Sequence, residues 1–193
     1  MRLRSLILVA LLMMAWACGS SNTSTSPTAD ATLHVLLKDS PFSDAKALLV
    51  TFSEVTVHAT GSGFGAEPRL PFVSDAPTRT CDLKKLATAQ DLLGTGALPA
   101  GHYTQLRLVV ASAVLYFDNA SSGAACAATI AAPAGRSTAV DIPSGELRLN
   151  REFDLTRTTP TTILLDFDGD RSVRDAGNGR FMMTPVVTVA NVY

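Results

Sequence analysis

The stretch "YTQLRLVVA", residues 103–111, decides the fold class of this chain. Leu106, Leu108 and Val110 alternate with other residues, and a β-strand turns successive side chains to opposite faces of its sheet. The alternation predicts a strand with these three residues facing a core. The opposite, outward face is expected to carry Tyr103, Gln105 and Arg107.

Short patterns of the same kind recur along the chain, with glycine, proline or asparagine between most of them. After residues 47–52 the alternation slips by one position at Ser53 and Glu54, which predicts a β-bulge. About ten short strands in one domain predict an all-β fold, an antiparallel sandwich or barrel. The other predicted strands span residues 32–38, 113–117, 137–142, 146–149, 151–155, 161–167 and 180–192.

The stretch "DLKKLATAQDLL", residues 82–93, is the exception to this pattern. Leu83, Leu86 and Leu93 lie near one stripe of a helix, and Gly94 follows directly as a helix stop. We therefore expect at most one short helix, in this part of the chain.

The N-terminus has the layout of an export signal. Arg2 and Arg4 precede an apolar run of about twelve residues, which is too short for a good membrane-spanning helix of roughly 20. Small residues then lead to Cys18, an arrangement that resembles the lipobox of bacterial lipoproteins, in which the cysteine is acylated and becomes the new N-terminus. An ordinary cleavage site with an incidental Cys18 is the alternative.

This layout predicts three regions along the chain. Residues 1–17 are expected to be a lipoprotein signal peptide, and residues 18–30 a flexible tether that starts at acylated Cys18, because "GSSNTSTSPTA" cannot bury apolar area. Residues 31–193 form one domain. The expected location is the bacterial cell envelope, lipid-anchored and at the outer rather than the inner membrane.

The charge balance excludes one class of partner. Removal of Arg2 and Arg4 with the signal leaves 14 Lys and Arg against 17 Asp and Glu, about −3. No basic block remains to bind a phosphate backbone, so we expect no nucleic acid partner. The one tryptophan, Trp16, leaves with the signal too.

Two cysteines, Cys81 and Cys126, remain for the domain. An exported protein can oxidise them to a disulfide, which would stabilise the fold by about 4 kcal/mol through the loop that it closes. Two free thiols are the alternative. Cysteines this far apart, without a C-x-x-C pair, do not form a zinc knuckle.

Several segments of the domain together resemble one family. In order, they are "HVLLKDSPF", "LPAGHYTQLRL", "IPSGELRLNREFDL", "TTILLDFDGDRSV" and "GRFMMTPVVTV". This series resembles DUF4382, a family of exported and often lipid-anchored bacterial domains of unassigned function. The resemblance implies an immunoglobulin- or transthyretin-like sandwich and supplies no catalytic residues. The segments that carry Cys81 and Cys126 are not part of it.

The stretch "LLDFDGDRSVRD", residues 164–175, places three aspartates on alternate positions, Asp166, Asp168 and Asp170. The first two share a face of the predicted strand, about 7 Å apart. The stretch does not fit an EF-hand, because Gly169 is at position four of the loop and Gly177 stands where glutamate is needed. A looser calcium site with these three ligands remains an alternative to a plain polar strand end.

No other pattern predicts a reaction. The sequence has no G-x-S-x-G motif and no metal-binding spacing among His34, His58 and His102, and no second acid pairs with the aspartates as in a glycosidase. We expect a non-catalytic envelope module, without a resident cofactor, that binds an envelope protein or a polysaccharide or has a structural role. A calcium-dependent binding module and a hydrolase with a site assembled from distant loops are the alternatives.

Overall fold

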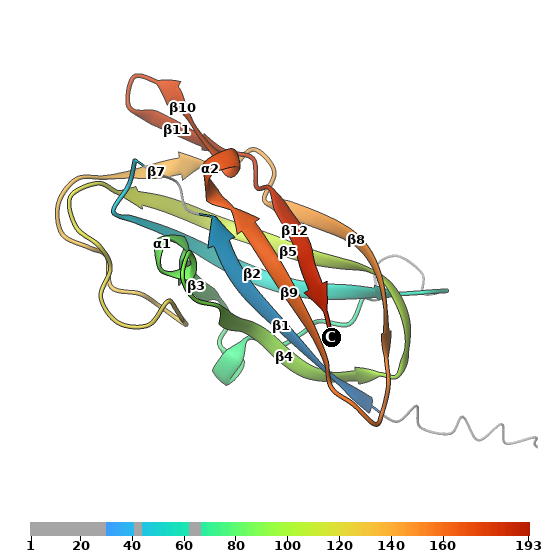
Figure 1. Ribbon diagram of the computed structural model, residues 1–193. Coiled ribbons are helices and arrows are strands. Elements are labelled where there is room, and N and C mark those ends of the chain that lie inside the picture. The colour runs from blue at the N-terminus through green and yellow to red at the C-terminus, as the bar shows by residue number, and fades with distance from the viewer. Residues whose placement is uncertain (1–29, 41–43, 62–66) are drawn as a thin grey trace, which may run out of the picture.

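The computed structural model describes residues 30–40, 44–61 and 67–193 and arranges them in two β-sheets (Figure 1). The smaller sheet has four strands, in the order β12 (Val187–Val192), β9 (Thr161–Asp168), β1 (Asp30–Ser40) and β4 (Asp91–Pro99). The larger sheet has eight strands. Seven of them lie in the order β10 (Val173–Gly177), β11 (Arg180–Met183), β7 (Ser137–Asp141), β5 (Gly101–Tyr116), β2 (Ala47–Ala59), β3 (Arg79–Asp82) and β6 (Cys126–Ala127). The eighth, β8 (Glu146–Leu155), pairs with β5.

The predicted all-β sandwich is confirmed, but its sheets are mixed rather than purely antiparallel. β1 pairs with β9 in parallel, from Leu33 opposite Thr161 to Ser40 opposite Asp168. β7 and β11 form a second parallel pair. Both pairs join strands that are far apart in the sequence. The alternation within one strand shows which face is buried but does not indicate whether a distant partner strand runs parallel or antiparallel to it.

The core lies between the two sheets and is built from the alternating apolar residues. Leu33, Val35 and Leu37 of β1 are completely buried. Phe167 of β9 meets Phe52 of β2 edge to face, with ring centroids 6.5 Å apart, so that the two sheets lock together. Each such side chain stabilises the fold by about 1.5–3 kcal/mol through the apolar surface that it buries.

The two long central strands show where the predicted alternation holds and where it fails. Leu106, Leu108 and Val110 of β5 are buried, and the pairing of β2 with β5 shifts register at Ser53, as predicted. Tyr103, however, was expected outward and is buried. The register of β5 also shifts between Tyr103 and Gln105, so the alternation changes phase there.

Burial gives Tyr103 two partners. Its ring stacks on Phe153 with centroids 5.4 Å apart, and its hydroxyl donates to the carbonyl of Pro99 at 2.8 Å. A phenol can be buried in this way because its one polar end is satisfied.

The single helix predicted over residues 82–93 is wrong in its extent. Only α1 (Leu83–Leu86) is helical, capped by the Asp82 side chain, which accepts from the Lys84 amide. The rest belongs to β4, in which Gly94 and Gly96 lie where Pro71 crosses the strand. A Cβ at either glycine would come within 2.9 Å of Pro71, so these glycines permit close approach instead of ending a helix.

The structure contains two further short helical segments, so the limit of one helix was also wrong. A 3-10 turn, η1 (Val73–Asp75), follows the crossing segment. α2 (Gly169–Ser172) directly follows β9. It forms where the Asp168 side chain accepts from the Arg171 amide, so the predicted polar strand end is also a helix cap.

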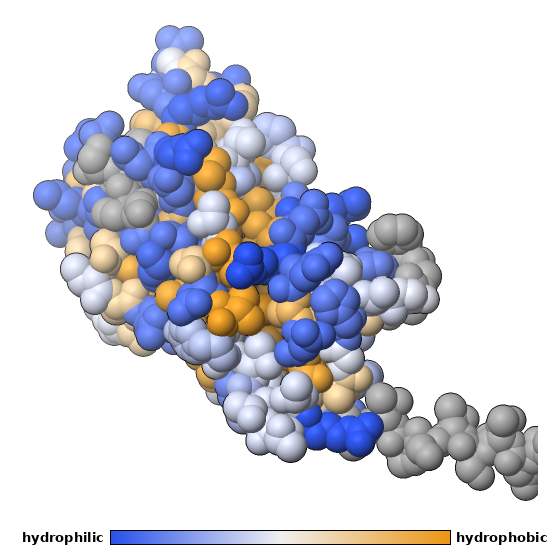
Figure 2. Space-filling model, turned by 45° about the vertical axis from the view of Figure 1, so that its right-hand side comes forward, coloured by the Kyte–Doolittle hydropathy of each residue, from blue (hydrophilic) through white to orange (hydrophobic). Residues whose placement is uncertain are grey.

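The outer face of the four-stranded sheet is neither fully polar nor fully apolar. Register places Leu36 of β1 between Leu92 of β4 and Leu164 of β9, and all three are half-buried. Figure 2 shows hydrophobic residues as a narrow band on this side of the molecule, bordered by hydrophilic ones.

The strands give the molecule two distinct ends (Figure 1). The N-terminal end holds the start of β1 at Asp30, which pairs with Pro99, and the turn that leads into β9. The opposite end, which we call the hairpin end, holds the last residues of β1 and β9, α2, the β10–β11 hairpin and the start of β7. β1 alone spans about 36 Å at ~3.3 Å per residue.

Candidate functional site

The three predicted aspartates lie at the hairpin end, but each has a different environment. Asp166 is on the outer face of β9 and forms an ion pair with Lys38 of β1 at 2.6 Å. Asp168 caps α2. Asp170 is inside that helix and is exposed.

The structure does not bring these three carboxylates together as ligands. Asp166 and Asp168 share the outer face, as predicted, but the turn of α2 carries Asp170 away from it, and Lys38 already balances Asp166. Among the residues that the structure describes, no three acidic, histidine or cysteine side chains form a group that could hold a metal ion. The calcium hypothesis gains no support from this geometry.

The sequence analysis missed a fourth carboxylate at this place, Asp39. It is the next inward position after Leu33, Val35 and Leu37, and it is buried beside the end of β9. One oxygen accepts from the Gly169 amide at 3.1 Å, while no described residue hydrogen-bonds to the other, buried oxygen. The alternation along β1 could have revealed it, because Asp39 has the same parity as the core leucines.

Burial raises the pKa of Asp39 to about 7. Desolvation is the largest cause, and the nearby charges of Asp166 and Asp168 act in the same direction. The Gly169 amide and Lys84 oppose the rise. A protonated, neutral Asp39 therefore persists to near-neutral pH at the point where β9 passes into α2.

α2 also fixes the base of the β10–β11 hairpin. The Ser172 hydroxyl donates to the Asp168 carbonyl and accepts from the Val186 amide at 2.8 Å. The Thr184 amide donates to the Ser172 carbonyl at 2.9 Å. These bonds attach both ends of the hairpin to one short helix, so the hairpin projects from a fixed base (Figure 1).

A cavity of about 400 Å³ lies between the hairpin and the adjoining end of β5 and start of β7. Phe117 and Phe181 line it with half-buried rings, whose centroids are 5.7 Å apart at 39°. The sequence analysis did not identify this cavity, because its walls come from three separate segments. Its lining residues are Phe117, Arg136, Ser137, Thr138, Gly179 and Phe181.

Ion pairs lie at and near this cavity. The Arg136 guanidinium donates to Asp118 at 2.8 and 3.1 Å and lies 5.9 Å from the centroid of the Phe117 ring. The hydrogen bonds from the Arg136 side chain and amide lower the pKa of Asp118. A second pair joins Arg180 to Asp141 at 2.8 Å. Asp118 therefore balances the charge that Arg136 brings to the cavity, whereas Arg180 and Asp141 are outside its lining residues.

The three histidines lie on separate parts of the molecule and do not converge. His34 Nδ1 contacts the Thr95 hydroxyl at 2.8 Å on the outer face of the smaller sheet. His102 pairs with the exposed Asp154 at the N-terminal end. His58 lies 3.6 Å from Glu67 beside the larger sheet.

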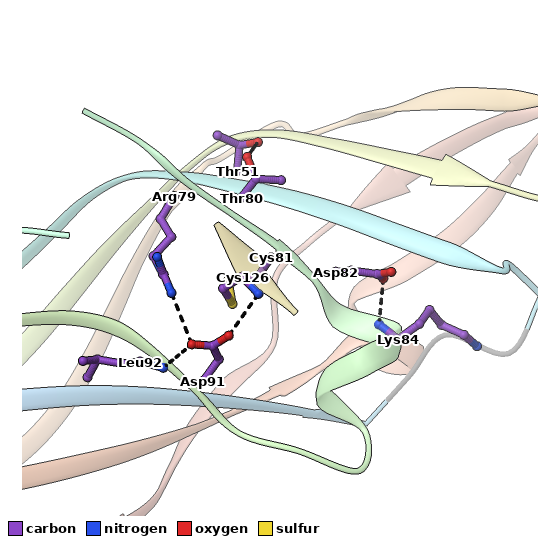
Figure 3. Close-up of a disulfide and its surroundings, with 9 residues drawn as sticks. All are labelled: Thr51, Arg79, Thr80, Cys81, Asp82, Lys84, Asp91, Leu92 and Cys126. Carbon is purple, nitrogen blue, oxygen red and sulfur yellow. Dashed lines mark hydrogen bonds and ion pairs between the residues drawn. A yellow bond between two sulfur atoms is a disulfide. The ribbon is translucent and has the colours of Figure 1, made fainter. Parts of the chain in front are cut away.

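The predicted disulfide joins Cys81 of β3 to Cys126 of β6, and both residues are buried (Figure 3). Asp91 reinforces this attachment, because it accepts from the Cys126 amide at 3.1 Å and from the Arg79 guanidinium at 3.2 Å. The disulfide thus anchors the long segment between β5 and β7 whose ends supply Phe117 and Arg136 to the cavity.

The predicted signal peptide, the acylated Cys18 and the tether up to residue 29 lie outside the described residues. Within the described part, no helix is long and apolar enough to cross a membrane.

Comparison with known families finds that the model of DUF4382, a domain of unknown function, matches residues 30–185. No curated protein and no solved structure matches the chain significantly. The immunoglobulin- or transthyretin-like relationship of the sandwich therefore stays a prediction.

Proposed function

Because the chain belongs to the DUF4382 family, a group defined by a domain of unknown function, we propose a function from its own geometry. The protein is a non-catalytic β-sandwich, attached to the bacterial envelope through an acylated Cys18, that binds a partner with its hairpin end.

The sequence layout and the start of the domain support the tether. The family match begins at residue 30 and β1 begins at Asp30, directly after the polar stretch that follows Cys18. A chain held at Cys18 is connected to the domain at its N-terminal end. Acylation with more than one chain gives stable anchoring, whereas one chain is marginal.

The opposed ends of the sandwich are the observation that carries the binding role. A domain whose tether joins it at Asp30 has its hairpin end far from the point of attachment, because β1 separates the two ends by about 36 Å. The fixed hairpin and the aromatic cavity are both at that far end. A projecting element on a rigid scaffold is a common place for recognition.

The pairing of polar groups supports a non-catalytic role. At the hairpin end, charged groups neutralise each other in two ion pairs, Arg136–Asp118 and Arg180–Asp141. Elsewhere the Ser121 hydroxyl, a residue type that can act as a nucleophile, donates to Asp82 at 2.6 Å, but both residues are buried and Asp82 also caps α1. These contacts serve the fold.

Two measurements test the proposal. Fractionation of cells that produce Cys18→Ala should move the protein from the membrane to the soluble fraction. A photo-crosslinking amino acid at exposed Ala176 of the hairpin should capture a discrete envelope component, whereas the same probe at exposed Thr158, at the N-terminal end, should not. Membrane retention of Cys18→Ala, or equal capture from both positions, would contradict the proposal.

A further inference from the structure

The cavity at the hairpin end combines three features that a binding pocket for a small polar molecule needs. It is concave, it has apolar walls, and it has a few polar groups at defined positions. Its apolar part consists of the Phe117 and Phe181 rings, which are inclined to each other and half-buried. Half-buried rings keep part of their surface available to a ligand.

The polar groups of the cavity are donors and acceptors rather than a net charge. Ser137 and Thr138 are successive residues of β7, so their side chains point to opposite faces of the strand. Thr138 shares its face with buried Val140, the residue that pairs with Phe181, and its hydroxyl is the one directed to the cavity side. Arg136 lies beside these two residues and is 79% exposed, although Asp118 balances its charge. A charged ligand would have to compete with the Arg136–Asp118 ion pair. A neutral ligand rich in hydroxyl groups can hydrogen-bond to these two side chains without breaking the pair.

The surroundings favour a small hydrophilic ligand over a protein partner with an apolar contact surface. The structure gives Tyr193 as an exposed large apolar side chain, and its backbone pairs with Thr162, toward the N-terminal end. Among the described residues of the hairpin end, no large apolar side chain is exposed. Protein interfaces usually bury an apolar centre with aromatic anchors, and the described residues of this end supply partly exposed rings only at the cavity itself.

We infer that this cavity binds a neutral saccharide unit. The C–H face of a pyranose ring stacks on Phe117 and Phe181, and its hydroxyl groups hydrogen-bond to Thr138 and Arg136. The inference rests on the proposed function and names the ligand class of its binding end. The partner at the envelope is then a glycan, reached by the hairpin end.

Saturation-transfer NMR on the purified full chain tests the inference directly. The probes are glucose, galactose, mannose and N-acetylglucosamine, each titrated to obtain a Kd. We expect saturation transfer to the ring protons of at least one of them. Phe181→Ala should weaken that binding about tenfold, which corresponds to about 1.4 kcal/mol. Thr138→Val, which keeps the side-chain shape and removes the hydroxyl, should weaken it by a smaller factor.

The matched control is Thr188→Val, an exposed strand threonine of β12 outside the cavity, which should bind as the unaltered protein does. Circular dichroism shows whether each variant is folded, and Thr138→Val provides the test if Phe181→Ala is not. Absence of transfer to all four saccharides, or equal affinity of the folded cavity variants, would overturn the inference.

The outcomes separate this inference from the proposed function. Capture of an envelope protein through the probe at Ala176, without saccharide binding, refutes the saccharide site and keeps the binding role of the hairpin end. Saccharide binding together with membrane retention of Cys18→Ala refutes the lipid tether and keeps the cavity.

Discussion

Asp39→Asn should remove a large part of the pH dependence of folding. In the folded protein Asp39 holds its proton up to about pH 7, whereas the same group in the unfolded chain releases it near 3.8. Between these values the folded state binds more protons, so the free energy of unfolding falls as pH rises and levels off above about pH 7. The contribution of Asp39 is therefore favourable at low pH and lost toward neutral pH.

The size of this effect follows from the two pKa values. Their difference corresponds to at most about 4 kcal/mol between about pH 4 and pH 8, because one pKa unit is worth about 1.36 kcal/mol. Asparagine stays neutral throughout and can still accept from the Gly169 amide. Any cost of burying its amino group is the same at both pH values, so it does not affect the comparison.

Urea unfolding followed by circular dichroism, at about pH 4.5 and about pH 8, measures the effect. The stability of Asp39→Asn relative to the unaltered protein should rise by several kcal/mol from the lower to the higher pH. Asp170→Asn, at an exposed position of α2, is the control and should follow the unaltered protein. Parallel pH profiles for Asp39→Asn and the unaltered protein would refute the reasoning.

Three further changes test the fold. Cys81→Ser with Cys126→Ser should lower the free energy of unfolding by about 4 kcal/mol in urea, and an unchanged midpoint would show that the disulfide contributes nothing. Phe167→Ala should cost about 3–5 kcal/mol by the same assay, because it empties a fully buried site between the sheets; a loss below about 1 kcal/mol would contradict that packing. Gly145→Ala should destabilise the protein and speed hydrogen exchange at the Val110 amide, because its Cβ would overlap the Val110 carbonyl; unchanged exchange would contradict this contact.

Local alternation predicted most of the strands because it reports which face each residue buries. It failed where one residue shifts the phase, as at Tyr103, and where another segment crosses the backbone, as at Gly94. Both events depend on partners far away in the sequence. The strand β4 was missed for the same reason, because its glycines are explained only by the close approach of Pro71.

The candidate site was predictable only in part. The place of Asp166 and Asp168 on one face followed from strand geometry, and the disulfide followed from the number of cysteines. The ion pair between Asp166 and Lys38 depends on the parallel register of β1 and β9, which no local pattern indicates. The cavity depends on the return of the hairpin to β7, and that contact is equally non-local.

The central place of β1 also dictates the order in which the chain can fold. Among the described strands β1 is synthesised first, yet its parallel neighbour carries Asp166, 128 positions after Lys38. Closing so long a loop is slow, so the smaller sheet is completed only after the C-terminal strands have emerged. A chain that ends before residue 161 leaves β1 without its parallel partner β9 and the core without Ile163, Leu165 and Phe167, and such truncated products should aggregate or be degraded.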